Sequence, residues 1–225
     1  MRANRPFKLA LLTIFTLLPP MYILTAENIS KRFGERKVFS KINFKLRTGQ
    51  SLAVIGSNGS GKSTLLKVLL FLLRPTRGEV IYSTELDQLN EKDIRNTVSF
   101  VSPYLNLYDH LTAEENLRFF STVAGGNVTG KEINDLLTKV GLEGRGMDFV
   151  AGYSSGMKQR LKYAVALLND PKYLFLDEPT SNLDEIGKKM VFDLVEEYRK
   201  KSIILIATNE KEEYALAEQQ CRLGS

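Results

Sequence analysis

The feature that most constrains the fold is a glycine-rich loop set between an apolar run and a helical pattern. Gly56, Gly61, Lys62 and Ser63 follow the spacing G-x-x-x-x-G-K-S, directly after the apolar residues 51–55. Glycines let the backbone wrap around phosphate oxygens, and the loop amides point inward at a helix start, which favours an anion. The pattern predicts a nucleoside triphosphate site on a strand, loop and helix unit, rather than an ordinary glycine-rich turn.

Each part of this loop has an expected partner in the ligand. Lys62 is expected to reach the β- and γ-phosphates, Ser63 to ligate Mg²⁺ through its hydroxyl, and Thr64 to offer its amide to the α-phosphate. ATP and Mg²⁺ are therefore the expected cofactors. The predicted nucleotide contacts of the loop are Gly56, Ser57, Asn58, Gly59, Ser60, Gly61, Lys62, Ser63 and Thr64.

Two adjacent carboxylates follow a second apolar run. Residues 173–176 read YLFL and lead directly into Asp177 and Glu178. At the carboxyl end of a strand, such acids lie where open α/β sheets bind ligands. Asp177 is expected to hold the magnesium through water, and Glu178 to act with Lys62 in catalysis by polarising the attacking water. A surface Asp-Glu pair is the alternative, and the apolar run upstream argues against it.

The rest of the chain alternates short apolar runs with amphipathic stretches, without a repeat or a break in composition. Helical patterns follow Gly61 and Gly156 and also run through LTAEENLRFFSTVA and EINDLLTKV. We expect one α/β domain over residues 21–225, with a helix-rich subdomain inserted at roughly 103–168. Buried strands are predicted at 51–55, 98–101, 173–176 and 203–207.

Composition places few further limits on function. The net charge of +5 suits an anionic ligand or a solvated surface, and no nucleic-acid partner is expected from it. Cys221 is the single cysteine, so an intrachain disulfide and a cysteine-based zinc site are excluded. His110 is the single histidine and lies in the polar stretch LYDHLT, where we expect it to face solvent.

Residues 1–20 are interpreted as an extension of the domain. MRANRPFK and the apolar LALLTIFTLL have the outline of a secretory signal, but the apolar run is too short to span a bilayer and meets Pro19 and Pro20 without a cleavage pattern. MYILTAENISKRFG, beginning at Met21, reads as an opening strand. An upstream start-site extension and a weak surface anchor are the two alternatives, in that order.

Between the loop and the acid pair lies YSSGMKQR, which resembles the signature motif of ATP-binding-cassette ATPases, usually written LSGGQ. Ser154 and Gly156 match its serine and second glycine, whereas Tyr153, Ser155 and Met157 depart from it. A serine hydroxyl and a glycine at a helix amino terminus can form an anion site. The resemblance implies that these residues act on the γ-phosphate held by a partner subunit.

The resemblance extends from Met21 to the end of the chain. It implies a P-loop NTPase core of three layers, with an inserted helical subdomain and a small antiparallel β subdomain. Phe33 stands where the family keeps an aromatic ring that stacks on adenine, although a place in the core is the alternative. The SNLD segment at 181–184 matches the family's D-loop, and Asp184 is an expected nucleotide contact.

Two positions depart from the family pattern. Pro103 aligns with the Q-loop glutamine, so Asn106, Ser102 or a backbone carbonyl is expected to substitute for it. Asn209 aligns with the switch histidine; it can donate an amide hydrogen bond to the γ-phosphate, but it cannot carry a charge or transfer a proton. Hydrolysis is then expected to depend on Glu178.

The resemblance implies an ATP-binding and ATP-hydrolysing subunit of an ABC transporter. Two cassettes, identical or different, would close head to tail over ATP and drive a separate transmembrane subunit. The expected location is cytoplasmic, peripheral at the inner face of the membrane. Two alternatives stay open: a soluble cassette ATPase that acts on nucleic acid or ribosomes, and a weakly hydrolytic regulatory cassette, which the two departures favour.

Overall fold

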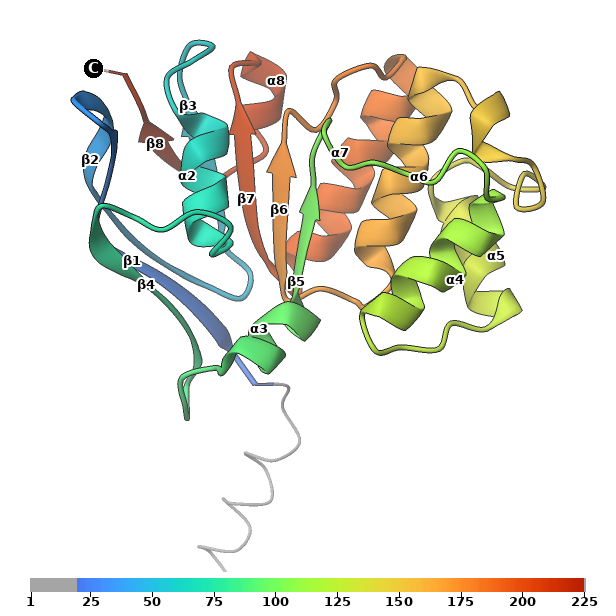
Figure 1. Cartoon of the computed structure of the whole chain (residues 1–225), viewed down its shortest axis with the longest axis horizontal. Helices are drawn as coiled ribbons and strands as arrows, with labels where there is room; N and C mark the ends of the chain where they lie inside the picture. Colours follow the sequence, from blue (N-terminus) through green and yellow to red (C-terminus); the bar gives the residue numbers. More distant parts are fainter. Residues whose placement is uncertain (1–19, 225) are drawn as a thin grey trace, which may run out of the picture.

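The computed structural model describes residues 20–224 and contains two separate sheets with helices packed on and between them (Figure 1). The larger sheet has the strand order β5-β6-β7-β3-β8, and every neighbouring pair is parallel. Its strands are β3 (Ser51–Ile55), β5 (Val98–Val101), β6 (Tyr173–Asp177), β7 (Ile203–Thr208) and β8 (Gln219–Arg222). Apart from Pro20, the interpreted extension 1–20 lies outside the described residues.

The smaller sheet is antiparallel and has the order β2-β1-β4. Its strands are β1 (Tyr22–Phe33), β2 (Arg36–Arg47) and β4 (Arg77–Thr84). Gly34, at φ 55°, makes the tight turn between the first two strands. α2 (Lys62–Leu69) lies between this sheet and the parallel sheet (Figure 1), and its buried leucines pack into one core with both.

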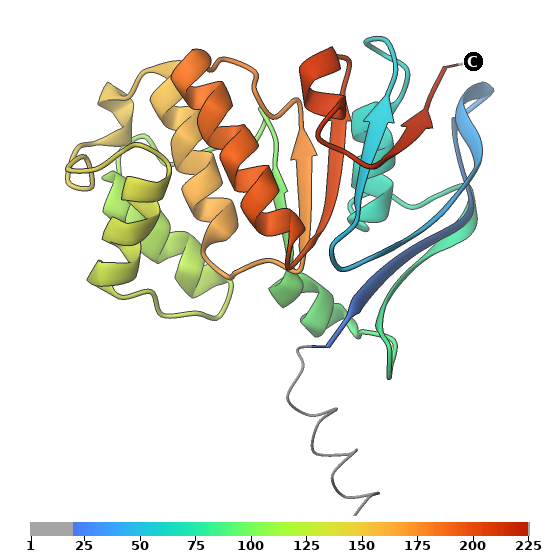
Figure 2. The ribbon, with the colours of Figure 1, turned by 180° about the vertical axis from the view of Figure 1, so that it is seen from behind.

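Most of the remaining helices are on the other side of the parallel sheet. Helices α4, α5 and α6 follow β5 in the chain and lie at the end of the molecule opposite the antiparallel sheet (Figure 1), whereas α7 crosses the back of the sheet (Figure 2). The helices other than α2 are α3 (Glu91–Thr97), α4 (Ala113–Val123), α5 (Gly130–Lys139), a 3-10 turn (Val150–Gly152), α6 (Ser155–Leu167), α7 (Glu185–Arg199) and α8 (Lys211–Tyr214).

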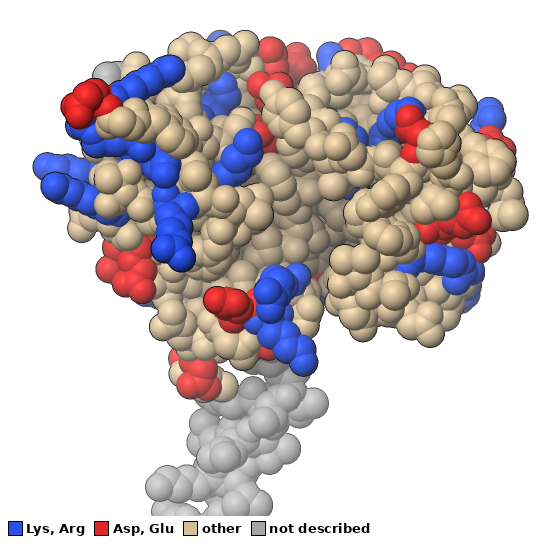
Figure 3. Space-filling view, in the orientation of Figure 1, with Lys and Arg blue, Asp and Glu red and all other residues tan. Residues whose placement is uncertain are grey.

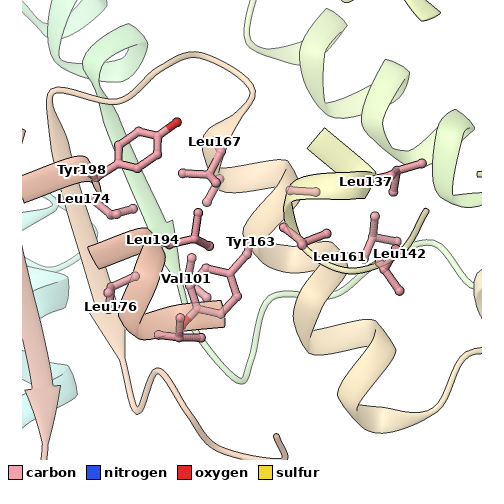
Figure 4. Close-up of a cluster of buried hydrophobic side chains, with 14 of the residues drawn as sticks. Val101, Leu137, Leu142, Leu161, Tyr163, Leu167, Leu174, Leu176, Leu194 and Tyr198 are labelled. Atoms are coloured by element: carbon pink, nitrogen blue, oxygen red, sulfur yellow. The ribbon is translucent and has the colours of Figure 1, made fainter. Parts of the chain in front are cut away.

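Side-chain alternation along the parallel strands explains why the sheet is covered on both faces. Tyr173 and Phe175 of β6 belong to the core shared with α2, while Leu174 and Leu176 belong to the core shared with α6 and α7. Figure 4 shows the second core, in which Tyr163 of α6 lies among these leucines. Strands buried on both faces need continuous apolar runs, which is what the sequence provides.

The structure confirms the predicted α/β class with a small antiparallel sheet, and the four predicted strands are β3, β5, β6 and β7. The helix after Gly61 is shorter than its apolar pattern suggested. Phe71 adopts a left-handed conformation at φ 56°, and the Leu72 N–H donates to the Lys67 carbonyl at 2.9 Å, which closes the helix end. Within the described residues, no helix is both long and apolar enough to cross a bilayer.

Candidate functional site

The loop after β3 has a backbone that admits no side chains at two of its glycines. Gly61 caps α2 at φ 103°, a conformation that L-residues rarely adopt. A side-chain carbon on Gly56 would lie 2.5 Å from the Ser60 hydroxyl oxygen and 2.8 Å from the Leu223 carbonyl oxygen. The loop therefore presents bare backbone at the start of a helix, as an anion site requires.

Charge and unused hydrogen-bonding capacity meet inside this loop. The Lys62 side chain is buried, and its Nζ donates to the carbonyls of Gly56 at 2.9 Å and Ser57 at 3.2 Å. The Ser60 hydroxyl is buried and has no hydrogen-bond partner within the described structure. Since buried polar groups are ordinarily paired, a held ammonium and an unpaired hydroxyl fit a loop that receives an anionic ligand.

The fold brings the acid pair to the loop. The Ser63 hydroxyl donates to Asp177 Oδ1 at 3.0 Å, although the two residues are 114 positions apart in the chain. Asp177 is 2% exposed, and this burial raises the pKa of its carboxyl, against the opposing effects of the Ser63 hydrogen bond and the Lys62 charge. A nearby cation would stabilise the ionised form of this buried carboxyl.

The donor set fits Mg²⁺. A hydroxyl and a carboxylate are hard oxygen ligands, and Mg²⁺ in nucleotide sites commonly takes one or two protein oxygens together with phosphates and water. Over residues 20–224, no group of three or more His, Cys, Asp or Glu side chains could hold a metal by itself. Ser63 and Asp177 are therefore the residues that would hold the ion, and the ligand's own phosphates would complete its coordination.

Glu178 lies between two cavities. One, the loop cavity, has a volume of about 500 Å³ and is lined by Phe33, Lys62, Ser63 and Glu178, among others. The other, the switch cavity, has a volume of about 470 Å³ and is lined by Glu178, Asn209, Glu212 and Glu213, among others. Glu178 has φ 48°, and its N–H donates to a β7 carbonyl at 2.9 Å. A non-glycine residue held in this conformation stores strain, as occurs at functional sites.

Phe33 is 52% exposed and lines the loop cavity, so it is not a core residue. The Lys31 Nζ lies 4.9 Å from its ring centroid, so a cation stands over one face of the ring. Arg36 lines the same cavity. Figure 3 shows Lys and Arg side chains gathered on the side of the molecule where the antiparallel sheet lies. An aromatic ring and nearby cations suit a base and its phosphates.

The signature residues lie beside the D-loop. Ser154 caps α6, and its hydroxyl accepts from the Met157 N–H at 3.2 Å. A side-chain carbon on Gly156 would lie 3.3 Å from the Asn182 carbonyl oxygen, which puts this helix start against the D-loop. Asp184 caps α7 and forms an ion pair with Arg160 of α6 at 2.7 Å. The structure thus groups Ser154, Gly156 and Asp184 together, away from the described lining of the loop cavity.

The segment at the Q-loop position is tied to α6 by a residue that the sequence reasoning missed. The Lys162 Nζ donates to the Pro103 carbonyl at 2.6 Å and to the Ser102 carbonyl at 3.5 Å. Burial lowers the pKa of Lys162. The Ser102 hydroxyl accepts from the Tyr104 N–H at 3.2 Å, and Asn106 is exposed. The Pro103 carbonyl therefore already accepts a hydrogen bond from Lys162 of the same chain.

Tyr104 is a second residue that the sequence reasoning missed; it lines the loop cavity together with the phosphate-binding loop. The signal that could have found it is an aromatic residue adjoining Pro103. Asn209 follows β7 and lines the switch cavity with Glu178, as its alignment with the switch position implies. His110 is exposed, as predicted, and takes no part in either cavity's described lining.

Comparisons with known proteins agree with this geometry. The family model for the ABC transporter matches residues 39–181. The chain is 35% identical to the lantibiotic transport ATP-binding protein SrtF of Streptococcus pyogenes, over 83% of this chain and 80% of that protein. It is 38% identical to the lipoprotein-releasing system ATP-binding protein LolD 1 of Caulobacter vibrioides, over 84% and 86%. A dimeric, post-hydrolysis structure of the ATP-binding cassette MJ0796 with ADP and Pi matches with TM-score 0.77 and 25% identity, over 89% and 94%.

Proposed function

The chain belongs to the ABC transporter family, and from this premise we propose the roles of its own residues in an ATPase cycle. It is an ATP-binding and ATP-hydrolysing subunit that works as a cassette dimer with the membrane components of a transporter. Its ATP-binding domain is proposed to span 21–225, with the helical subdomain at roughly 103–168.

Lys62 is proposed to bind the β- and γ-phosphates. Its buried ammonium donates to two loop carbonyls, and phosphate oxygens can replace those acceptors. Phe33 is proposed to stack on the adenine ring at the open end of the loop cavity. Ser63 and Asp177 would hold Mg²⁺, which supplies charge neutralisation for the phosphates when it is bound.

Glu178 is proposed as the general base that orients and polarises the attacking water. The observation that carries this proposal is the hydrogen bond between Ser63 and Asp177, because it places the carboxyl end of β6 against the start of α2. Glu178 is the next residue and lines the loop cavity. Asn209, across the switch cavity, is proposed to donate a hydrogen bond to the γ-phosphate but not to take a proton.

Ser154 and Gly156 are proposed to complete the nucleotide site of the partner cassette, because they lie at the start of α6, where the first amides have no acceptor in a preceding helical turn and the helix favours an anion. We further propose that the chain is held peripherally at the inner face of the cell membrane through its transmembrane partner. Relatives that carry the names of lantibiotic and lipoprotein-releasing systems support a role in transport.

Phosphate release at saturating Mg-ATP tests these roles. Glu178→Gln should lower turnover by roughly 10²- to 10⁴-fold, the usual contribution of a positioned base. Glu85→Gln, which makes the same change at an exposed residue outside the described lining of both cavities, is the matched control and should keep wild-type turnover. Asn209→Ala should lower turnover by less than Glu178→Gln does, and Lys62→Ala should weaken ATP binding. A Glu178→Gln variant as fast as wild type would remove the assignment of the base.

A weakly hydrolytic regulatory cassette is the second candidate. Pro103 and Asn209, which stand where the family has a glutamine and a histidine, are the observations that favour it. Both candidates require ATP binding and dimer formation, so turnover separates them. Absence of phosphate release by the wild-type chain, measured together with its membrane partner, would support the regulatory role.

A further inference from the structure

The segment that follows Glu178 is held from two sides by buried side chains. The Thr180 N–H donates to Glu213 Oε1 at 2.9 Å, and the Thr180 hydroxyl donates to the same oxygen. The Tyr163 hydroxyl donates to the Pro179 carbonyl at 2.7 Å. Glu213 belongs to α8, directly after the switch position, and Tyr163 belongs to the helix that begins at the signature motif.

Glu213 is an unusual residue to find at this depth. It is 2% exposed, and its second carboxylate oxygen, Oε2, is buried without a hydrogen-bond partner in the described structure. A carboxylate that leaves water and uses only one of its oxygens is unfavourable for stability. Such a group needs an explanation other than packing, because an apolar side chain would fill the same space at lower free-energy cost.

The geometry at Glu178 supplies that explanation. Its backbone is in the left-handed region at φ 48°, a conformation that a residue with a Cβ adopts only when its surroundings impose it. The Glu178 N–H donates to Ala207 and its carbonyl accepts from the Ser181 N–H at 3.1 Å. Pro179 and Thr180, the two residues in between, are held by hydrogen bonds with Tyr163 and Glu213. We call the pair of Glu213 and Thr180 the clamp, because it restricts the backbone next to Glu178.

We propose that Glu213 is a positioning residue that holds Glu178 in its water-orienting conformation through Thr180. The same carboxylate joins the base to the switch segment, because Asn209 directly follows β7, Glu213 lies in α8 four residues later, and both line the switch cavity. Movement of the switch segment would thus be transmitted to the base through one hydrogen-bonded pair. The inference rests on the proposed role of Glu178 as the base.

A set of single variants tests the clamp through kcat, KM for ATP and the urea unfolding midpoint. Glu213→Ala should lower kcat by roughly 10- to 100-fold, as expected when a catalytic group is displaced, with KM changed less than about twofold because the phosphate-binding loop is untouched. Glu213→Gln should recover most of that loss, since its amide oxygen can accept both Thr180 hydrogen bonds. Lys211→Ala, at an exposed residue of α8 that is absent from the described lining of the switch cavity, should match wild type in kcat and KM.

Thr180 gives an independent arm. Thr180→Val removes the hydroxyl donor and keeps the shape, so kcat should fall by less than in Glu213→Ala, and Thr180→Ser should restore it. In a Glu178→Gln background, Glu213→Ala should add almost no further loss, because the group that it positions is gone.

The outcomes separate this inference from the proposed function. A fast Glu178→Gln variant would overturn the base itself. A slow Glu178→Gln variant together with a folded Glu213→Ala variant of wild-type kcat would overturn the clamp alone. Equal losses in Glu213→Ala and Glu213→Gln would also overturn it, since charge rather than the acceptor oxygen would then matter. If Glu213→Ala does not fold, a Thr180→Val variant with wild-type kcat overturns the clamp by itself.

Discussion

Gly61→Ala is expected to destabilise the fold for two separable reasons. The first is conformational: at φ 103° a residue with a Cβ is strained by about 1–2 kcal/mol. The second is steric, because the new methyl carbon would overlap Cγ1 of Val38 on β2, and such overpacking costs about 1–3 kcal/mol. The free energy of unfolding should therefore fall by about 2–5 kcal/mol in the absence of nucleotide.

Two further variants separate these terms in urea unfolding. Gly59→Ala has the same kind of backbone, at φ 80°, but its methyl group would meet nothing within 4 Å, so only the conformational part should appear. Combining Gly61→Ala with Val38→Ala should give a double variant about 1–3 kcal/mol more stable than the sum of the two single effects. If the effects of Gly61→Ala and Val38→Ala on the free energy of unfolding are additive, the steric argument is refuted. If Gly59→Ala lowers that free energy as much as Gly61→Ala does, backbone strain alone explains the loss.

Three more expectations concern other parts of the structure. Gly78→Ala should lower the free energy of unfolding, measured in urea, by about 2–5 kcal/mol, because φ is 86° and the methyl group would overlap the β1 backbone. A second substitution cannot remove this overlap, since the overlapping atoms are backbone atoms. Lys162→Met, which keeps the apolar stem but removes the donor, should speed amide hydrogen exchange at Tyr104 by roughly tenfold, the equivalent of one charge-assisted hydrogen bond; unchanged exchange would refute the tie to Pro103. Hydrogen bonding from a backbone N–H and the Arg160 side chain lowers the pKa of Asp184 below its ordinary 3.8, so its ionised form adds stability above that value and loses it as pH falls through the folded pKa. The stability difference between wild type and Asp184→Asn should therefore shrink in urea unfolding below about pH 4, and a constant difference would contradict this.

The sequence predicted the parts of the site whose chemistry is local. The glycine spacing before Lys62 encodes the loop by itself, since backbone freedom and a helix start are needed at that point. The acids Asp177 and Glu178 could be located because a buried parallel strand must end where ligands bind. Their contact with the loop could be expected from these two rules, and the hydrogen bond from Ser63 agrees with it.

The parts that could not be predicted depend on contacts between distant segments. Nothing near Lys162 in the sequence indicates that its ammonium meets the Pro103 carbonyl, because that contact depends on how α6 packs beside β5. The Glu213 carboxylate reaches Thr180 across 33 positions, and a glutamate in a run of charged residues looks like a solvated surface group. The end of α2 at Leu69 was missed because a phenylalanine, not a glycine, takes the left-handed position after it.

The strand order has a consequence for how the nucleotide site arises during protein synthesis. The neighbours of β3 in the sheet are β7 and β8, the last two strands of the chain. The Ser51 hydroxyl accepts a hydrogen bond from the Glu218 N–H, across 167 residues. At ribosomal rates of about 5–20 residues per second, β7 and β8 are synthesised roughly 10 to 30 s after β3. The complete nucleotide site therefore forms only after most of the chain has been made, and a nascent chain that lacks β7 would expose an apolar strand to chaperones and proteases.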